Sequence, residues 1–384
     1  MPRSAVRQVS ILLLATAVCI CAGAARAGQA TVATRITTVA GRNGAVIVTL
    51  SSATAGAQVY YTVDGSTPTI RSTPYEAPFL VSSNLTVRAV AQARGEAVSR
   101  VTTRKFHLSI PSGTLVWSDE FDATAGPGGS ARPDPHLWNY DTGADTNDSI
   151  DVLCAYGSSA APCNPAFPNS YLGNDGDLRI VAQQPSPGIY TSARIDTRKR
   201  FSFQYGRLEA RIWVPEGQGI WPAFWVLGNN VDVVDWPACG EVDIMERVNG
   251  PGLPPRGKDP SPTPPRGTSD WNEGTLHGTG FARDGIGRPY YFRGGITAAG
   301  WHTYGIIKSP GRIEFYVDDP ARPYATFTPR SIASLPGAVW SFDNGQSFYL
   351  IVNIAVGGDW PGSPDASTHF PATMRIDYVR LYSN

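Results

Sequence analysis

The sequence predicts an all-β protein built from two β-sandwich domains, and three observations support this fold class. Short runs that alternate between apolar and polar residues recur along the chain, which is typical of strands with one buried face. Glycine and proline, with 40 and 32 residues of 384, mark the connections between these runs. No long window shows the 3.6-residue apolar period of an amphipathic helix. Many strands with such connections favour sheets stacked face to face.

Residues 1–27 have the composition of a secretory signal. Two arginines form a charged start, residues 9–23 are an apolar run, and Ala-Arg-Ala at 25–27 fits a small-x-small cleavage site. A membrane anchor is the alternative, but the apolar run is short for a span of ~20 residues. We therefore expect cleavage after Ala27, a secreted mature protein and no membrane association.

The charge balance gives no reason to expect an anionic partner. The chain has 32 basic and 32 acidic residues, and without residues 1–27 it has 29 basic and 32 acidic residues. Nucleic acid and anionic membranes, which select basic surfaces, are therefore not expected as partners. We expect the mature protein to be a monomer.

Three cysteines remain after removal of the signal. Cys154 and Cys163 enclose a loop that contains proline and serine, which suits a local disulfide in an exported protein. Cys239 is left over, and no histidine close in the sequence accompanies it as a catalytic partner. We interpret Cys239 as a packed, apolar thiol.

Residues 28–110 form the first predicted domain, a small antiparallel sandwich. Strand-like runs occur at 46–50, 59–63, 85–91 and 101–106. The run at 60–75, with Tyr-Tyr-Thr-Val-Asp-Gly-Ser-Thr-Pro-Thr followed by Ser-Thr-Pro-Tyr, resembles the immunoglobulin-like module found at the C-terminus of chitobiases. This unit has no cluster of tryptophan, histidine or carboxylate residues, so a spacer role is expected. Sugar binding is the alternative, through Tyr60, Tyr61 or Tyr75.

Residues 113–384 form the second predicted domain, after a linker at 110–113. Its clearest strand-like runs are at 178–182, 207–213, 313–317, 348–356 and 374–382. All ten tryptophans of the chain lie in this domain. Their distribution indicates that an aromatic-rich cleft belongs to the second domain and not to the first.

One stretch, residues 236–246, has the sequence Trp-Pro-Ala-Cys-Gly-Glu-Val-Asp-Ile-Met-Glu and places three carboxylates within six residues. On a regular strand, Glu241 and Asp243 share a face and Glu246 points to the other one. A β-bulge near residues 244–245 returns Glu246 to the first face, and bulges are common beside active sites. Two glutamates can then lie ~5–5.5 Å apart, as a retaining glycosidase requires.

A buried strand with charged ends is the alternative interpretation of this stretch. Aspartate and glutamate are rarely buried without partners. Like charges on one face also repel one another unless one of the groups holds a proton. This mutual perturbation is what acid–base chemistry uses, and it favours a catalytic site.

The motif at 241–246, Glu-Val-Asp-Ile-Met-Glu, resembles the signature of glycoside hydrolase family 16, in its laminarinase-like form. The run at 219–228, Gly-Ile-Trp-Pro-Ala-Phe-Trp-Val-Leu-Gly, strengthens the resemblance. The resemblance implies a β-jelly roll of the concanavalin A type whose concave face carries the cleft. It also implies that Glu241 is the nucleophile and Glu246 the general acid, later the base. Asp243, between them, is expected to orient Glu241.

Aromatic rings near the carboxylates are candidate sugar platforms. Trp236 lies five residues before Glu241 and is the best candidate, followed by Trp221 and Trp225. These two are four residues apart, so a regular strand places both on one face, either the cleft or the core. The resemblance does not decide between the two faces.

Three polar residues complete the substrate-binding set that the resemblance implies. His277, in Thr-Leu-His-Gly, falls on the strand after the catalytic one and is expected near the acid/base. Arg194 matches a position that faces the sugar, where its planar donor fork suits pairs of hydroxyls. Asn147 is a candidate for sugar contacts on the non-reducing side, although the sequence around it departs from the family pattern.

The resemblance implies no cofactor for catalysis, but it does suggest a structural calcium ion. Glu120 and Asp377 match the chain ends that bind calcium in many relatives, and oxygen ligands suit this ion. A surface pair without metal is the alternative. No cluster of histidine and cysteine with zinc spacing occurs. The proline-rich segment at 250–270 is expected to be an extended loop, either bordering the cleft or forming a surface insertion.

The function expected from these features is hydrolysis of β-1,3-glucan by a secreted endo-acting enzyme. A mixed-linkage glucanase or a galactanase of the same family is the first alternative, because a fold does not fix a substrate. A non-catalytic glycan-binding jelly roll is the second alternative. Retention of all three acids at 241–246 disfavours it.

Overall fold

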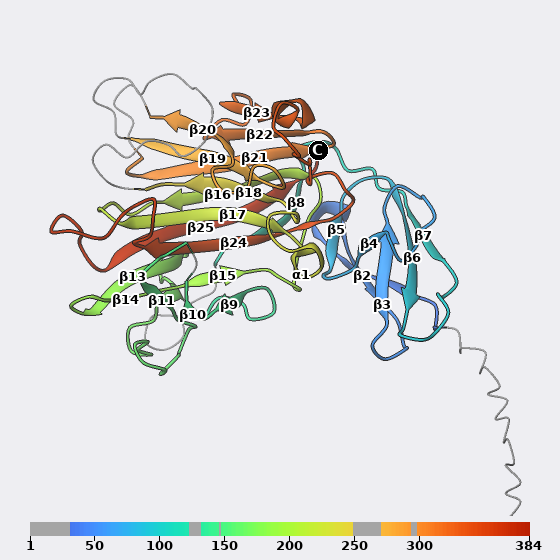
Figure 1. The fold of residues 1–384 in the computed structure, drawn as a ribbon, viewed down its shortest axis with the longest axis horizontal. Coiled ribbons are helices and arrows are strands. Elements are labelled where there is room, and N and C mark those ends of the chain that lie inside the picture. Colours follow the sequence, from blue (N-terminus) through green and yellow to red (C-terminus); the bar gives the residue numbers. More distant parts are fainter. Residues whose placement is uncertain (1–30, 123–131, 146, 249–269, 293–297) are drawn as a thin grey trace, which may run out of the picture.

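The computed structural model describes residues 31–122, 132–145, 147–248, 270–292 and 298–384, and the regular secondary structure in these ranges is almost entirely β (Figure 1). The expected signal and nearly all of the proline-rich segment lie outside them. Within them, one short α-helix and two 3-10 helices occur, namely α1 (Val231–Val234), η1 (Arg42–Gly44) and η2 (Pro329–Ile332). No helix in these ranges is long and apolar enough to cross a membrane.

The N-terminal unit is a sandwich of two antiparallel sheets. The first sheet has the strand order β1 (Arg35–Ala40), β2 (Val46–Ser51), β5 (Phe79–Val81). The second has the order β4 (Thr73–Pro74), β3 (Gln58–Thr62), β6 (Leu85–Gln92), β7 (Thr102–Phe106). Between the sheets, Tyr61 is buried and stacks on Phe79 with ring centres 5.0 Å apart. Tyr61 is therefore a core residue and not a sugar platform.

The second unit is a larger sandwich of an eleven-stranded and a seven-stranded sheet. The central path of the larger sheet is β10 (Gly143–Ala144), β11 (Asp151–Leu153), β14 (Ile189–Ser192), β13 (Leu178–Ser186), β25 (Ala372–Tyr382), β16 (Gly206–Trp213), β21 (Trp301–Ser309), β22 (Arg312–Val317), β23 (Ala325–Phe327). Two more strands pair at its side, β12 (Ser170–Leu172) with β13 and β8 (Leu115–Asp119) with β25.

The seven-stranded sheet carries the strand with the three carboxylates near its middle. Its order is β20 (Ile286–Tyr291), β19 (Trp271–His277), β18 (Glu241–Glu246), β17 (Ile220–Gly228), β24 (Phe348–Val356), β15 (Arg194–Asp196), β9 (Asn139–Asp141). Its pairings are all antiparallel. The predicted all-β fold is confirmed. The strand predicted at 348–356 has the observed bounds, and the one predicted at 313–317 lies within β22 (Arg312–Val317).

Strand β24 shows how this sheet serves two purposes. All nine of its residues are buried. Alternate residues pack in the core between the two sheets, namely Phe348, Leu350, Val352, Ile354 and Val356. The residues between them line a cavity on the other face, namely Tyr349, Ile351, Asn353 and Ala355. The period of two therefore separates the core from the cleft along one strand.

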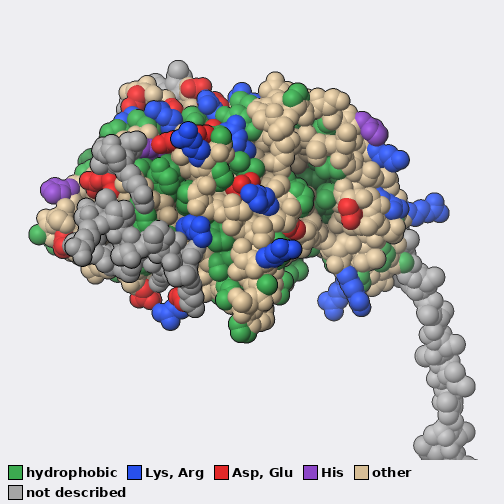
Figure 2. Space-filling view, turned by 90° about the horizontal axis from the view of Figure 1, so that it is seen from above, with side chains coloured by type: hydrophobic (Ala, Val, Ile, Leu, Met, Phe, Trp, Pro, Cys, Tyr) green, Lys and Arg blue, Asp and Glu red, His purple; other side chains and the backbone are tan. Residues whose placement is uncertain are grey.

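The two units are in direct contact. Leu80, on β5, lies within the apolar core cluster of the larger sandwich, and its backbone N–H donates to the Ser202 carbonyl at 3.0 Å. The Ser202 hydroxyl donates to the Pro78 carbonyl at 2.8 Å. Figure 2 shows basic side chains projecting from the N-terminal unit, whereas both charge signs are mixed over the larger unit.

Candidate active site

The catalytic strand contains the predicted β-bulge. On the β17 side, Trp225 pairs with Asp243 and Phe224 pairs with Met245, so Ile244 has no partner of its own. On the β19 side, the register shifts between Asp243 and Glu246 as well. Ile244 and Met245 both turn into the core, and Glu246 therefore returns to the face of Glu241. All three carboxylates line one cavity of about 400 Å³.

Glu241 is held by an indole and lies close to a cation. Trp236 donates from Nε1 to Glu241 Oε2 at 3.1 Å, and His277 Nε2 lies 4.0 Å from Glu241 Oε1. Burial raises the pKa of Glu241 to about 8, and the charge of Asp243 adds to the rise. The charges of His277 and Arg194 act in the opposite direction and favour the ionised form that a nucleophile needs.

Glu246 lies deeper than Glu241 and receives its hydrogen bond from another indole. Its exposed fraction is 8%, and Trp221 donates from Nε1 to Glu246 Oε1 at 3.0 Å. Burial holds the pKa of Glu246 well above its usual value, and the negative charges of Asp243 and Glu273 raise it further. Such a carboxyl group retains its proton near neutral pH, as a general acid must.

His277 is the cation that balances these carboxylates. Its Nε2 lies 3.2 Å from Asp243 Oδ2, and its Nδ1 lies 2.5 Å from the carbonyl oxygen of Ala282. Both ring nitrogens thus face acceptors, which favours the doubly protonated ring. Burial alone lowers the pKa of His277, but the hydrogen bond and charge of Asp243 outweigh it and raise the pKa to about 10.

Trp225 and Arg194 form one wall of the cleft. The Arg194 guanidinium carbon lies 5.7 Å from the centre of the Trp225 ring. Arg194 donates to Asp145, and Trp225 donates from Nε1 to Asn353 Oδ1 at 2.8 Å. The structure thus places Trp225 on the cleft face, with its ring and the guanidinium fixed by buried partners.

A second cavity of about 300 Å³ continues past the glutamates on the other side. It shares Asn147, Trp221, Trp236, Glu241 and Glu246 with the first cavity and adds His277, Arg283, Asp284, Asp359 and Trp360. The Trp360 ring meets the Trp221 ring edge-on at 5.3 Å. Trp236 stands at the junction of the two cavities with 45% of its surface exposed.

The sequence reasoning missed several of these cleft residues. Trp360, Asp359, Asn353 and Asp145 were not singled out, although each lines a cavity next to the glutamates. A tryptophan after an aspartate, in Gly-Gly-Asp-Trp-Pro-Gly directly after β24, was the available signal for two of them. Turn glycines beside an aromatic residue at the end of a cleft strand are typical of binding loops.

The expected calcium ligands are paired with arginines. Arg380 donates to both carboxylate oxygens of Glu120, at 2.8 to 3.2 Å, and this interaction lowers the pKa of Glu120. Arg211 donates to Asp377 Oδ2 at 2.8 Å. Both carboxylates are thus paired with guanidinium groups in this geometry, and calcium binding by these residues stays a prediction.

Another acidic cluster comes close enough to surround an ion, and it is the catalytic one. In the described ranges, the one such group is Glu241, Asp243 and His277. Since both nitrogens of His277 face acceptors within the protein, its ring has no lone pair to offer to a metal. The cluster is therefore a set of ion pairs suited to proton chemistry.

The cysteines do not belong to this cluster: two form a disulfide, and the third is buried. A disulfide joins Cys154 to Cys163. Cys239 is a free, fully buried thiol, and burial raises its pKa to about 12. A thiol in this state is not nucleophilic, which agrees with a packing role.

Hydrolysis of a glycosidic bond requires two carboxyl groups in different protonation states and a surface that holds sugar rings. Glu241 and Glu246 share a cleft face, Glu246 is the more deeply buried of the two, and an indole N–H donates to each. The fold and the site thus define the protein as a glycoside hydrolase.

Comparisons with known proteins extend this assignment. Residues 177–252 match the family model described as "XgeA-like, catalytic GH16 domain", and residues 48–106 match the one described as "Fn3 associated". The beta-glucanase of Rhodothermus marinus is 36% identical over 281 residues, which cover 71% of this chain and 86% of that protein. The laminarinase catalytic domain of Thermotoga maritima is 34% identical, with a TM-score of 0.56, covering 71% of this chain and 99% of that one.

Another relative is considerably longer than this chain. Glucan endo-1,3-beta-glucosidase A1 of Niallia circulans is 32% identical over 295 residues, but the match spans 38% of its length. The chain belongs to glycoside hydrolase family 16, and its enzyme class is that of the endo-glucanases. The Fn3-associated match agrees with an immunoglobulin-like N-terminal module.

Proposed function

We propose that this protein is a secreted, retaining endo-β-glucanase that cleaves internal β-1,3-glucosidic bonds of laminarin-type glucans. The observation that carries the proposal is the bulge at Ile244, because it brings Glu241 and Glu246 to one face of the cleft. A separation of ~5–5.5 Å between two such carboxyl groups leaves no room for an attacking water and favours double displacement.

In the first step, a carboxylate oxygen of Glu241 attacks the anomeric carbon as the bond to the leaving oxygen breaks. Glu246 gives its proton to that oxygen, which leaves as the hydroxyl of the departing glucan. The electron pair of the broken bond stays on the leaving oxygen. The surroundings of Glu246, buried and facing other carboxylates, support its role as the donor.

In the second step, Glu246, now ionised, takes a proton from water. The resulting hydroxide equivalent attacks the anomeric carbon and releases Glu241, so that the β-configuration is restored. Asp243 binds His277 and thereby keeps a positive charge near Glu241. The positive charge of His277 supports the ionised form of Glu241 when this carboxylate leaves the anomeric carbon at the end of the cycle.

Internal cleavage is supported by the cavities on both sides of the glutamates. One side has Arg194 and Trp225, and the other has Asp284, Asp359 and Trp360. A polymer can therefore continue past the reacting bond in both directions. The names of the Niallia circulans and Thermotoga maritima relatives support a β-1,3-linked glucan as the substrate.

Mixed-linkage glucan is a second candidate substrate, because relatives with other specificities match over similar lengths. Endo-1,3-1,4-beta-glycanase ExsH of Rhizobium meliloti is 29% identical over 298 residues. A keratan-sulfate endo-1,4-beta-galactosidase of Sphingobacterium multivorum is 29% identical over 271 residues. The beta-1,3-glucan-binding protein of Penaeus monodon, 33% identical over 226 residues, represents the binding alternative. All three acids of the motif are present here, which disfavours binding without catalysis.

Secretion belongs to the proposal and rests on the sequence of residues 1–27. A mature chain starting at Gly28 is expected in the medium of an expressing culture. N-terminal sequencing checks this, and a retained N-terminus in the secreted protein contradicts the cleavage site.

Two measurements test the activity. Release of reducing ends from laminarin, lichenan and galactan, assayed side by side, ranks the candidate substrates. Proton NMR of the first-formed product gives the stereochemistry, and an initial α-anomer excludes double displacement. With an activated aryl glycoside, azide should rescue Glu246→Ala as a β-glycosyl azide, and a β-azide from Glu241→Ala reverses the assigned roles.

A further inference from the structure

A third cavity, of about 590 Å³, lies on the larger sheet, outside the catalytic cleft. It is formed by the loop at 166–168, strands β12 and β13, and the turn before β25, and its lining residues are Ala166, Phe167, Pro168, Tyr171, Val181, Gln183, Gln184, Pro185, Phe370 and Pro371. On β13, Ile180 and Ala182 belong to the core, so Val181 and Gln183 face the opposite side. The cavity therefore opens on the outer face of the eleven-stranded sheet.

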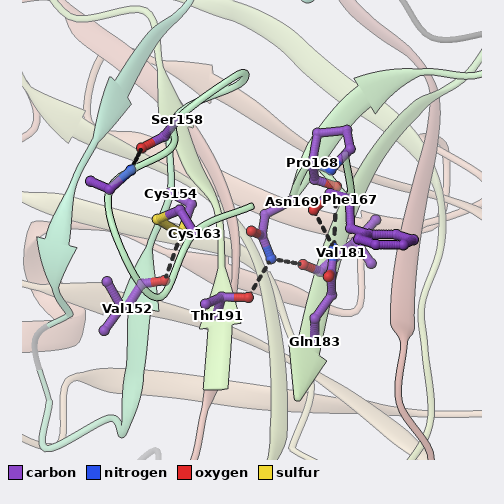
Figure 3. Close-up of a disulfide and its surroundings, with 11 residues drawn as sticks. Val152, Cys154, Ser158, Cys163, Phe167, Pro168, Asn169, Val181, Gln183 and Thr191 are labelled. Carbon is purple, nitrogen blue, oxygen red and sulfur yellow. Dashed lines mark hydrogen bonds between the residues drawn. A yellow bond between two sulfur atoms is a disulfide. The ribbon is translucent and has the colours of Figure 1, made fainter. Parts of the chain in front are cut away.

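The wall that carries Phe167 is fixed from several directions (Figure 3). Gln183 donates from Nε2 to the carbonyl oxygens of Phe167 and Pro168, at 3.0 and 3.3 Å. Asn169 is 2% exposed and donates to the Val181 carbonyl at 2.8 Å and to Thr191 Oγ1 at 3.0 Å. The disulfide closes the preceding loop. The loop backbone is thus held rigidly against the strand.

This rigid wall presents an aromatic ring to solvent. Phe167 has 65% of its surface exposed, which is the highest value among the large exposed hydrophobic residues in the described ranges. Phe370 also lines the cavity and packs on Tyr190 with ring centres 5.4 Å apart. Phe167, Phe370 and the three prolines of the lining together form an apolar surface around one cavity, and grouped exposed apolar residues of this kind mark interaction sites.

The lining selects for a neutral ligand. None of the ten residues around the cavity carries a charge. Gln184 donates from Nε2 to the Tyr190 hydroxyl at 3.2 Å, and Gln183 is fixed through its own Nε2. Within the described ranges, neither amide oxygen has a hydrogen-bond partner in the protein. Two oriented acceptors between aromatic walls suit hydroxyl groups next to C–H faces, as a pyranose ring presents them.

We propose that this cavity is a second glycan-binding site, which takes a segment of a neutral β-linked glucan chain. The inference rests on the proposed function, since the polymer that the cleft cleaves supplies the ligand. Because the site lies on the outer face, it holds a distant part of the same polymer or a neighbouring chain. The expected benefit is an increased local concentration of substrate at the cleft.

Affinity electrophoresis in gels that contain laminarin, lichenan or galactan tests the proposal. The parent is full-length Glu241→Gln, which does not degrade the polymer. Adding Phe167→Ala or Phe370→Ala should weaken the apparent affinity by at least about fivefold, by analogy with the loss of one stacking ring. Ala166→Glu, which places a charge at the rim without removing a ring, should weaken binding as well. Trp213→Ala, an exposed aromatic residue outside the cavity, is the matched control.

Parallel assays separate the two proposals. If the wild type releases no reducing ends from laminarin, the proposed β-1,3 specificity fails, while the gels with the other polymers still test the cavity. Unchanged affinity for all three polymers in both phenylalanine variants overturns the second site. Equal weakening by Trp213→Ala also overturns it. Self-association of the parent that Phe167→Ala abolishes, measured by sedimentation, assigns the surface to a protein contact instead.

Discussion

Both sandwiches of this chain are built from strands whose residues alternate between two faces, but the strands serve different functions in the two units. In the N-terminal module, β6 pairs with β3 and β7 without a shift in register, and its inward residues are apolar. In the catalytic domain, β18 shifts register against both neighbours and turns three carboxylates to one face. The two strands therefore differ by one irregular residue, Ile244. Strand β6 serves packing alone, whereas β18 also supports catalysis.

The two units also differ in the charge of their buried polar residues. In the described part of the module, the buried polar residues are Thr31, Thr34 and Ser99, all uncharged. The catalytic domain buries charged groups next to one another, including Asp243, Glu246 and Glu273. Burial of like charges opposes folding. The domain tolerates this cost because His277 and two indole N–H groups compensate part of it.

The largest expected difference between the two units is in activity. Glu241→Ala removes the attacking carboxylate and should lower kcat/KM on laminarin by ~10⁴-fold or more. Tyr60→Ala, on the module, should leave kcat/KM on the same soluble glucan unchanged. Initial-rate kinetics with circular dichroism as a folding control make the comparison. A comparable loss in Tyr60→Ala would assign the module a part in catalysis.

Removal of the module should affect stability more than chemistry. A chain of residues 113–384 should hydrolyse soluble glucan with a kcat close to that of the full protein, because every candidate catalytic residue is retained. Loss of Leu80 from the shared core removes ~1.5–3 kcal/mol of apolar burial. The Tm should then fall by roughly 3–12 °C for a domain of this size.

Leu80→Ala in the full chain is the control for this truncation and should reproduce part of the fall in Tm. A folded truncation that loses nearly all activity on soluble glucan would contradict the independence of the catalytic domain. An unchanged Tm would show that the contact between the units contributes nothing.

Trp236→Ala tests the exposed platform at the junction of the two cavities. The ring donates to Glu241 and is half exposed to the cleft, so its loss removes a stacking face and one hydrogen bond. We expect kcat/KM to fall by a factor equivalent to ~1–3 kcal/mol. Trp213→Ala, far from the cleft cavities, should have no effect on kcat/KM. Unchanged efficiency in Trp236→Ala would exclude this ring from substrate binding.

The carboxyl cluster should also make the stability of the catalytic domain depend on pH. The folded-state pKa of Glu246 is raised well above 4.5, mainly by burial, so above pH 4.5 the folded chain holds a proton that the unfolded chain has lost. Stability therefore falls as pH rises above this value, by ~1.4 kcal/mol per pH unit for one such proton. His277, raised from 6.5 to about 10, contributes in the same direction at higher pH.

Glu246→Gln cannot titrate at this position, so its stability should fall less steeply between pH 5 and 8. Denaturant unfolding at several pH values measures both slopes. Parallel slopes for the wild type and Glu246→Gln would mean that Glu246 does not hold a proton in the folded protein over this range.

The sequence alone predicted the strands, the carboxylate motif and its bulge, because these features are local. Alternation along residues 348–356 is visible without knowing which strand lies beside them. The bulge followed from the spacing of Glu241 and Glu246 together with the demand that both reach one substrate. In each case a period of two residues and one chemical requirement were sufficient.

Only the tertiary structure decided the partners of each charge. Glu120 and Arg380 are 260 residues apart in the chain, and Arg194 and Asp145 come from separate segments. The same holds for Leu80 in the core of the catalytic domain and for Phe167 and Phe370, which line one outer cavity. Such contacts depend on how strands distant in sequence lie side by side, and local periodicity carries no information about that arrangement.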